Sequence, residues 1–319
     1  RGLLGAHVPE RVLGRGQLRR PRLPVQPRLD GPRLLGQDVP RRLLAARLLP
    51  QRQLRVPPVV ARRGLLGAHV PERAVHEVGQ ADIVVAVGGD GTIMRVARQV
   101  LDAGASSRIL GVSGGRLGFL AAFEVEELPL YLDAIRAGTL SIENRHALHW
   151  RLLRDGREAA TGCAVNDVVL AAGQPFRAIE LEGEVDGGAI PRFLGDGLIV
   201  ATSAGSTAHA ASAGGPIVAP GLEATILVPL AAHSLAWRPL VLPAEASVAL
   251  NVHHANEGSS LVQDGRLAER LQAGDRVEVA SHFQTLRFLR HPERPFGATL
   301  AAKLGWAAPP SWRRPGDDA

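Results

Sequence analysis

The feature that most limits the fold of this chain is an apolar run that ends in a glycine-rich loop, VVAVGGDGT at residues 84–92. Residues 82–87 are almost continuously apolar, which is typical of a parallel strand covered on both faces. After the loop, apolar side chains recur with the spacing of one helical face. These are Ile93, Val96, Ala97, Val100 and Leu101. The segment therefore predicts a strand, a tight loop and a helix, which are the parts of an α/β domain.

The residues that follow predict a second strand and a second glycine-rich turn. Residues 108–112 read as the strand, and SGGRLGF at 113–119 reads as the turn. A helix is expected over 126–137, ending at Gly138, because glycine is favoured just past a helix C-terminus. This order of elements continues the α/β pattern.

From about residue 139 the apolar residues alternate with a period of two, which indicates β-strands. Asp155-Gly156 and Asp186-Gly187-Gly188 are typical hairpin turns between such strands. We predict an α/β domain at 74–138 and an all-β, sandwich-like domain at 139–289. Residues 290–308 are expected to pack back on the first domain, and 309–319 read as a tail.

Residues 1–73 do not read as a folded domain. Residues 1–82 use only ten amino-acid types, all with codons that begin with G or C, and RGLLGAHVPER occurs unchanged at 1–11 and 63–73. Residues 1–73 have a net charge of +12, whereas the rest of the chain has −6. We interpret this leader as disordered or non-native, out-of-frame sequence. The alternative is a basic arm that binds nucleic acid, although the leader has no aromatic residue to stack on a base.

Composition excludes several classes of protein. No apolar run approaches the 18 residues of a membrane-spanning helix, and no secretory signal is evident. Cys163 is the only cysteine, which excludes an internal disulfide and a cysteine-cluster metal site, and we expect it in the core of a protein of the reducing cytoplasm. The only lysine, Lys303, is not part of a P-loop, and the dinucleotide motif G-x-G-x-x-G is absent.

The loop itself predicts an anion site. Gly88, Gly89 and Gly91 can bring backbone N–H groups close to a phosphate, next to a helix N-terminus that Thr92 is placed to cap. A carboxylate at Asp90 would be repelled by that phosphate unless it has a role. It could accept a proton from an attacking hydroxyl, orient that hydroxyl or hold Mg²⁺. Alternatively, the loop is only a tight turn in which Asp90 is a local cap.

GGDGT resembles the nucleotide site shared by NAD kinases, diacylglycerol and sphingosine kinases and 6-phosphofructokinases. Further blocks over about residues 74–308 resemble the NAD kinase family in order and spacing. They are GRLGFLA at 115–121, VNDVVL at 165–170, GDGLIVATSAGSTAHAASAGGPIVAP at 195–220, HSLAWRPLVLP at 233–243, QDG at 263–265 and KLGW at 303–306. The resemblance implies a Rossmann-like first domain and an active site between the two domains.

The resemblance also implies an activity. NAD kinases transfer a phosphoryl group from ATP, or in some members from polyphosphate, to the adenosine 2′-hydroxyl of NAD, which gives NADP. Mg²⁺ or another divalent cation would come with the ATP, so we predict no metal site made by the protein alone. NAD and ATP are the expected partners, without nucleic acid or membrane, and the expected assembly is a homodimer or homotetramer.

The resemblance assigns roles to residues of both domains. Asp90 would meet the 2′-hydroxyl, Gly91 would lie against the ribose, and Gly88 and Gly89 would lie near the phosphates. The other nucleotide-binding residues of the first domain would be Thr92, Arg95 and the pair at the adenine pocket, Phe119 and Leu120, both of which could instead be core.

In the second domain, Asn166 and Asp167 would bind ribose hydroxyls at the nicotinamide end, or else cap a β-turn. A run of small and polar residues would let a ring lie flat on the backbone, or would simply allow tight packing: Thr207, Ala208, His209 and Ser212. Three residues depart from the usual family pattern: Ser113, Ala204 and His209.

Three other functions are open at this stage. A lipid kinase of the same superfamily would need membrane contact, which the net charge of −6 outside the leader does not favour. An inactive NAD-binding relative is the second. The first strand and helix of the α/β domain should precede residue 74, and residues 1–73 do not show the pattern of either. A nucleic-acid binder that uses the leader is the third.

Overall fold

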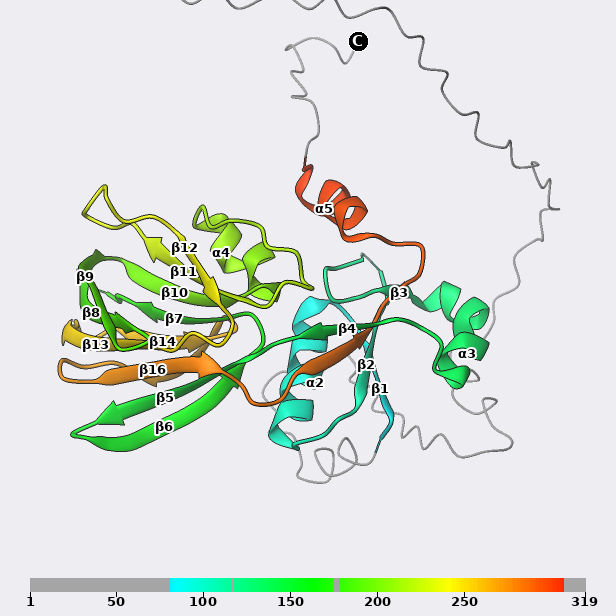
Figure 1. The fold of residues 1–319 in the computed structure, drawn as a ribbon, viewed down its shortest axis with the longest axis horizontal. Helices are drawn as coiled ribbons and strands as arrows, with labels where there is room; N and C mark the ends of the chain where they lie inside the picture. The colour runs from blue at the N-terminus through cyan, green and yellow to red at the C-terminus, as the bar shows by residue number, and fades with distance from the viewer. Residues whose placement is uncertain (1–80, 116, 175–177, 307–319) are drawn as a thin grey trace, which may run out of the picture. The chain divides into compact units, whose positions relative to one another are not determined.

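The computed structural model describes residues 81–306 except residue 116 and residues 175–177. The leader at 1–73 and the tail at 309–319 lie outside these residues. The described chain contains one sheet flanked by helices and two sheets with little helix around them (Figure 1).

The first sheet contains strands from distant parts of the sequence. Its path is β1-β2-β17-β4, and β3 also pairs with β2. Strand β2 pairs in parallel with β1, β3 and β17, whereas β4 is antiparallel to β17. Their bounds are β1 Ile83–Val87, β2 Arg108–Ser113, β3 Phe123–Glu124, β4 Ile142–Arg145 and β17 Leu286–Leu289. The chain therefore returns to this sheet after it has built the other two.

Two helices pack against the first sheet. The helix α2, Asp90–Asp102, buries the five apolar residues predicted for its inner face, and it shares one core cluster with β1 and β2. The helix α3, Leu128–Ala137, packs one partly buried face, which includes Tyr131 and Ile135, into a second cluster with the same strands. The predicted end at Gly138 is confirmed, since this glycine has a left-handed φ of 67°. The first turn of the predicted helix is instead a 3-10 turn, Val125–Glu127.

The remaining strands form two antiparallel sheets of six strands. One has the order β12-β11-β10-β7-β14-β15, and the other has the order β6-β5-β16-β13-β8-β9. The first consists of β7 Asp167–Ala171, β10 Gly197–Thr202, β11 Ala224–Leu230, β12 Leu240–Pro243, β14 Ser260–Gln263 and β15 Arg266–Arg270. The second consists of β5 Leu148–Arg154, β6 Arg157–Ala164, β8 Ile179–Val185, β9 Gly188–Gly195, β13 Val248–His254 and β16 Arg276–Ser281.

These two sheets pack face to face. Fully buried side chains of both belong to one cluster, among them Leu152 and Leu181 of the second sheet and Leu170 and Leu198 of the first. The predicted sandwich is therefore confirmed. On the other face of the first of these sheets, Ala210 packs with strand residues of β7, β10 and β11.

Short helices complete the described chain. They are the 3-10 helix η2, Ala204–Thr207, and the helices α4, His209–Ser212, and α5, Phe296–Leu304. No helix among residues 81–306, the gaps aside, is long and apolar enough to cross a membrane.

Three hairpins of the sandwich turn on an Asp-Gly pair, and in each the two residues have positive φ. Two of these turns are the predicted ones, which join β5 to β6 and β8 to β9; the third joins β14 to β15. The φ values are 51° and 72° for Asp155-Gly156, 50° and 76° for Asp186-Gly187, and 45° and 73° for Asp264-Gly265. Asparagine, aspartate and glycine adopt these angles most readily, which explains the sequence at all three turns.

Candidate active site

Two glycine-rich loops follow neighbouring parallel strands, β1 and β2, at the end of the sheet where α/β proteins bind ligands. The Gly88 N–H donates to the Val112 carbonyl at 2.8 Å, which joins the first loop to β2. Gly88 has a φ of 154°, and a Cβ there would lie 2.8 Å from the Thr92 side chain. A side chain at Gly89 or Gly91 would meet only open space, so both are accessible to a ligand.

The helix begins three residues earlier than a cap at Thr92 would require. Its first residue is Asp90, and its N-cap is Gly89, which makes no side-chain cap hydrogen bond. The Thr92 N–H donates to the Gly89 carbonyl at 2.9 Å, so Thr92 lies within the first turn. The prediction that Thr92 caps the helix is therefore wrong. The acidic Asp90 in the first turn matches the positive end of the helix dipole.

The Asp90 carboxylate joins the two loops. Its Oδ2 accepts the Phe119 N–H at 2.8 Å, and its Oδ1 accepts the Leu120 N–H at 3.0 Å. A Cβ on Gly118 would lie 1.8 Å from Asp90 Oδ1, so this glycine is needed for the close approach. Both partners are about 30 residues away along the chain. The local-cap interpretation of Asp90 is therefore wrong.

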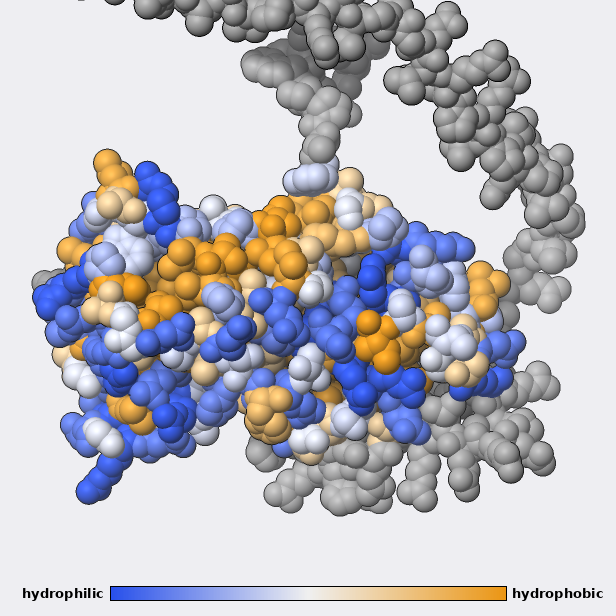
Figure 2. Space-filling model, in the orientation of Figure 1, coloured by the Kyte–Doolittle hydropathy of each residue, from blue (hydrophilic) through white to orange (hydrophobic). Residues whose placement is uncertain are grey.

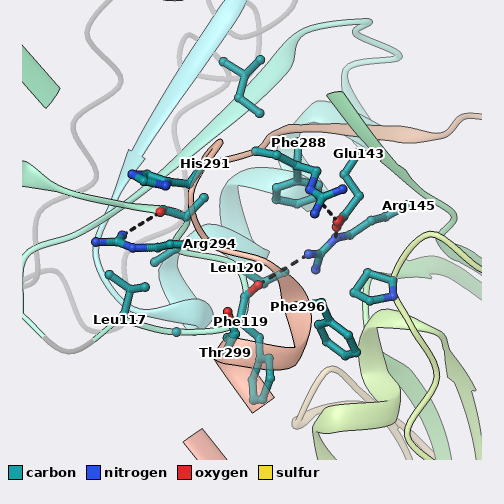
Figure 3. A pocket seen from close by; sticks show the side chains of 16 residues that line it. Leu117, Phe119, Leu120, Glu143, Arg145, Phe288, His291, Arg294, Phe296 and Thr299 are labelled. Atoms are coloured by element: carbon teal, nitrogen blue, oxygen red, sulfur yellow. Dashed lines mark hydrogen bonds and ion pairs between the residues drawn. The ribbon is translucent and has the colours of Figure 1, made fainter. Parts of the chain in front are cut away.

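The second loop borders a pocket (Figure 3). Phe119 is half-buried and lines this pocket together with Pro220, Phe296 and Thr299. Leu120 contributes to the lining, but it is only 6% exposed and belongs to the core cluster of α2. Loop 117–122, the end of the 195–220 block and α5 therefore meet here.

Arg145 also lines this pocket (Figure 3). Its Nη2 lies 3.5 Å from the Phe119 carbonyl, and its Nε donates to Glu143 at 2.5 Å. Its guanidinium also lies 5.0 Å from the ring centroid of Phe288. These contacts hold the second loop against β4 and β17.

Asn166 and Asp167 lie at the start of β7, where Asp264 binds the backbone. The Asp264 carboxylate accepts the N–H groups of Val165 at 3.1 Å, Asn166 at 2.7 Å and Asp167 at 3.3 Å. In return, the Asp264 N–H donates to the Asp167 carbonyl at 3.0 Å. The backbone of this predicted substrate-binding segment is therefore fixed by one carboxylate.

The Asp167 side chain has an unusual environment. It is 4% exposed, and burial, followed by the nearby Asp264 carboxylate, raises the pKa of Asp167 to about 7. Asp167 therefore changes charge near neutral pH, unlike an ordinary aspartate.

Three arginines gather beside the Asp264 turn. Arg98 of α2 forms an ion pair with Asp264 at 2.5 Å, and the Asp264 side chain is 0% exposed. Burial, and then the charges of Arg98 and Arg95, lower the pKa of Arg266. The Nε of Arg95 is buried without a hydrogen-bond partner among the described residues. Arg95 and Arg98 are three positions apart on α2, so they share one face of the helix.

The run of small and polar residues at 205–212, GSTAHAAS, begins against Asn166. A Cβ on Gly205 would lie 2.1 Å from the Asn166 carbonyl oxygen, and the Thr202 N–H donates to that oxygen at 2.8 Å. Of the predicted residues here, Thr207 and Ala208 are half-buried, whereas His209 and Ser212 are exposed on α4.

The predicted site residues thus form two groups. One contains Asp90, Phe119 and Leu120, and the other contains Asn166, Asp167 and the run that begins at Gly205. Helix α2 connects them, because Asp90 at its N-terminus is about 12 Å along the axis from Arg98, which binds Asp264.

Sequence reasoning gave no role to Arg98, Asp264 or Arg266. The QDG block was the available signal, since it contains Asp264 and is followed by Arg266. It did not reveal a buried carboxylate, because Asp-Gly at a hairpin usually indicates only a turn.

Solved structures place this architecture among the nucleotide-dependent kinases. The yeast NADH kinase complexed with NADH has a TM-score of 0.70 and is 26% identical, covering 77% of this chain and 71% of that chain. The NAD kinase of Archaeoglobus fulgidus in complex with ATP has a TM-score of 0.59 and is 28% identical, covering 70% and 84%. The fold and its likeness to these kinases therefore define a two-domain phosphotransferase, as the sequence predicted.

Sequence comparisons identify the family. The family model described as ATP-NAD kinase N-terminal domain matches residues 68–140, and that of the ATP-NAD kinase C-terminal domain matches residues 165–291. The NAD kinase of Syntrophotalea carbinolica is 39% identical over 72% of this chain and 79% of its own length. The NAD kinase of Teredinibacter turnerae is 40% identical over 73% and 79%. This chain belongs to the NAD kinase family of phosphotransferases.

Proposed function

We propose that this chain transfers the terminal phosphoryl group of ATP, or of polyphosphate, to the adenosine 2′-hydroxyl of NAD, with Mg²⁺ or another divalent cation bound to the donor. The observation that carries this proposal is the position of the Asp90 carboxylate. Asp90 is the first residue of α2, and its carboxylate accepts hydrogen bonds from the backbone N–H groups of Phe119 and Leu120. It lies between two glycine-rich loops, where an anion and a hydroxyl can both approach the backbone.

The donor phosphates would bind the first loop. Backbone N–H groups at Gly89 and Gly91, together with the N-terminus of α2, favour negative charge, and both glycines face open space. Arg95, in the second turn of α2, would add positive charge toward the donor. The metal ion would arrive with the phosphates and neutralise charge that develops during transfer.

Asp90 would orient the 2′-hydroxyl for attack. The hydroxyl oxygen forms a bond to the terminal phosphorus, the bond from that phosphorus to the bridging oxygen breaks, and ADP leaves. The hydroxyl proton passes to Asp90 and then to solvent. Because the transition state of phosphoryl transfer is loose, orientation contributes more than early removal of this proton.

The acceptor would span the two groups of residues. Phe119 would border the adenine, and Asn166 and Asp167 would bind ribose hydroxyls at the nicotinamide end. The backbone near Thr207 and Ala208 would lie beside a ring of the substrate, with His209 and Ser212 at its edge. The fixed backbone at Asp167 supports this assignment, because a preorganised segment loses little entropy on binding.

The activity test uses the purified full chain with NAD, ATP and Mg²⁺. We expect NADP to form and its formation to stop when EDTA removes the metal ion. Absence of NADP would contradict the proposal. Phosphorylation of diacylglycerol vesicles in place of NAD would support the lipid-kinase alternative.

The rate should depend on pH through Asp167. Its pKa of about 7 means that the carboxylate is mostly protonated below neutral pH, where it accepts hydrogen bonds from ribose hydroxyls poorly. We therefore expect kcat/KM for NAD to fall as pH drops through about 7. In Asp167→Asn this dependence should disappear and kcat/KM should be low throughout. A pH profile of Asp167→Asn that matches the unchanged chain would contradict the role.

A homo-oligomer is the proposed assembly, and β12 is its proposed contact. This strand is at the edge of its sheet among the described strands, and its Leu240 and Val241 are 46% and 48% exposed. Figure 2 shows apolar side chains gathered over this part of the molecule. An exposed apolar edge strand favours pairing with another chain. A monomer in light scattering would contradict the assembly.

We also propose a cytoplasmic location without nucleic-acid or membrane partners. Cys163 is half-buried, and burial followed by Asp102 raises the pKa of its thiol to about 11, which keeps it protonated and unreactive. Fractionation of cells that express the chain would test the location.

A further inference from the structure

The third Asp-Gly turn differs from the other two in the environment of its aspartate. All three turns have the same backbone geometry. Asp155 and Asp186 are exposed, whereas the Asp264 side chain is 0% exposed. Turn geometry requires a residue that tolerates positive φ, but it does not require a buried charge. The turn explains the backbone of Asp264, and the contacts of its carboxylate explain its burial.

Its contacts come from two separate parts of the fold. The backbone N–H groups of residues 165–167 belong to the start of β7, in the sandwich. The guanidinium of Arg98 belongs to α2, in the α/β sheet region. One carboxylate thus binds both the predicted acceptor segment and the helix that begins at Asp90.

We infer that Asp264 is a positioning residue for phosphoryl transfer, which holds the acceptor-binding segment 165–167 in register with helix α2. The inference rests on the proposed function. Asp264 acts through Asn166 and Asp167 on one side and through α2 on the other, without touching the reacting atoms.

The negative charge of Asp264 is part of this role. A carboxylate has enough lone pairs for several N–H donors and a guanidinium, whereas an asparagine amide offers one acceptor oxygen. The Arg98 side chain is only 12% exposed, and replacing Asp264 by asparagine would remove its ion-pair partner. The segment and the helix would then lose their common anchor.

Asp264 also affects the charge state of Asp167. The groups around this pair are Arg98 on α2, which binds Asp264, and Arg266 at the start of β15, which interacts with Asp264 and with Arg95. Removing the Asp264 charge should lower the pKa of Asp167, because the Asp264 carboxylate contributes to raising it. A loss of activity that came only from a less stable fold would leave the pH profile in place.

The test compares Asp264→Asn with Asp155→Asn in the full chain. The two substitutions are chemically the same and occur in the same type of turn, and asparagine tolerates both backbones. We expect Asp264→Asn to lower kcat/KM for NAD by about 10- to 100-fold, the size of effect that a small misplacement of a reacting group produces. The KM for ATP should stay within about twofold, since the first loop has separate contacts, and Asp155→Asn should behave like the unchanged chain.

Two further measurements separate positioning from stability. In Asp264→Asn the fall of kcat/KM at acid pH should move to lower pH than in the unchanged chain. Arg98→Lys, which keeps the charge but loses the guanidinium fork, should fold and show a smaller loss than Asp264→Asn. It serves as the reporter if Asp264→Asn does not fold.

Two outcomes would overturn the inference while leaving the proposed function intact. One is NADP formation by the unchanged chain together with a kcat/KM for Asp264→Asn within about twofold of it. The other is a loss in Asp264→Asn that appears only as a lower melting temperature, with an unmoved pH profile. If the unchanged chain itself makes no NADP, the proposed function fails instead.

Discussion

Replacing Asp90 by asparagine is expected to lower kcat for NADP formation by a factor on the order of 10²–10⁴, the usual contribution of a positioned general base. Asparagine cannot accept the hydroxyl proton, and it replaces one of the two oxygens that accept the Phe119 and Leu120 N–H groups by an NH₂ donor. The substitution thus removes the proton acceptor and loosens the contact between the two loops. Steady-state kinetics with saturating NAD and ATP measure the effect.

Asp102→Asn is the matched control for that substitution, because Asp102 is an exposed aspartate at the opposite end of the same helix. It should retain the full rate. Thermal unfolding of both variants shows whether the loss at Asp90 is catalytic or results from unfolding. Full activity in a folded Asp90→Asn variant would remove Asp90 from the mechanism.

Gly118→Ala is expected to lower activity on the order of 100-fold without changing any group that could take part in the chemistry. The new methyl carbon would lie 1.8 Å from Asp90 Oδ1 and 2.4 Å from its Cγ, far inside contact distance. Either the carboxylate or the second loop must move, so the hydrogen bonds to Phe119 and Leu120 are lost. The measurements are kcat and KM for both substrates.

Gly115→Ala provides the control in the same loop, since a Cβ there would meet no atom within 4 Å. It should leave kcat nearly unchanged. If Gly118→Ala also retained full activity, the contact between Asp90 and the second loop would not matter for the reaction. In a variant that lacks the Asp90 carboxylate, the alanine at 118 should cost less, because the atoms that it displaces are gone.

The sequence predicted best those features that depend on neighbouring residues. The apolar period of 93–101 identified the buried face of α2, and the Asp-Gly pairs at 155 and 186 identified two hairpins. In both cases the pattern and the structure involve the same few residues. The family resemblance supplied the arrangement of the two domains.

Features that depend on distant residues were not predictable in this way. The hydrogen bonds from Phe119 and Leu120 to Asp90 join different loops, and the contacts of Asp264 join the start of β7 to helix α2. The assignment of Thr92 as a cap failed for a local reason instead. Glycine and aspartate can enter a helix as well as precede it, so the sequence did not define its first residue.

The place of β17 in the first sheet determines the order in which the ribosome can complete this enzyme. Arg287 of β17 pairs with Arg108 of β2, so a central strand of the first sheet is synthesised after the whole sandwich. Until it emerges, Arg108 and Ile109 of β2 lack a strand partner on that edge, and an open strand edge favours association with other chains. The nascent chain therefore carries its GGDGT loop on an unfinished sheet for most of its synthesis. The first sheet is therefore complete only when nearly all of the described residues have been synthesised.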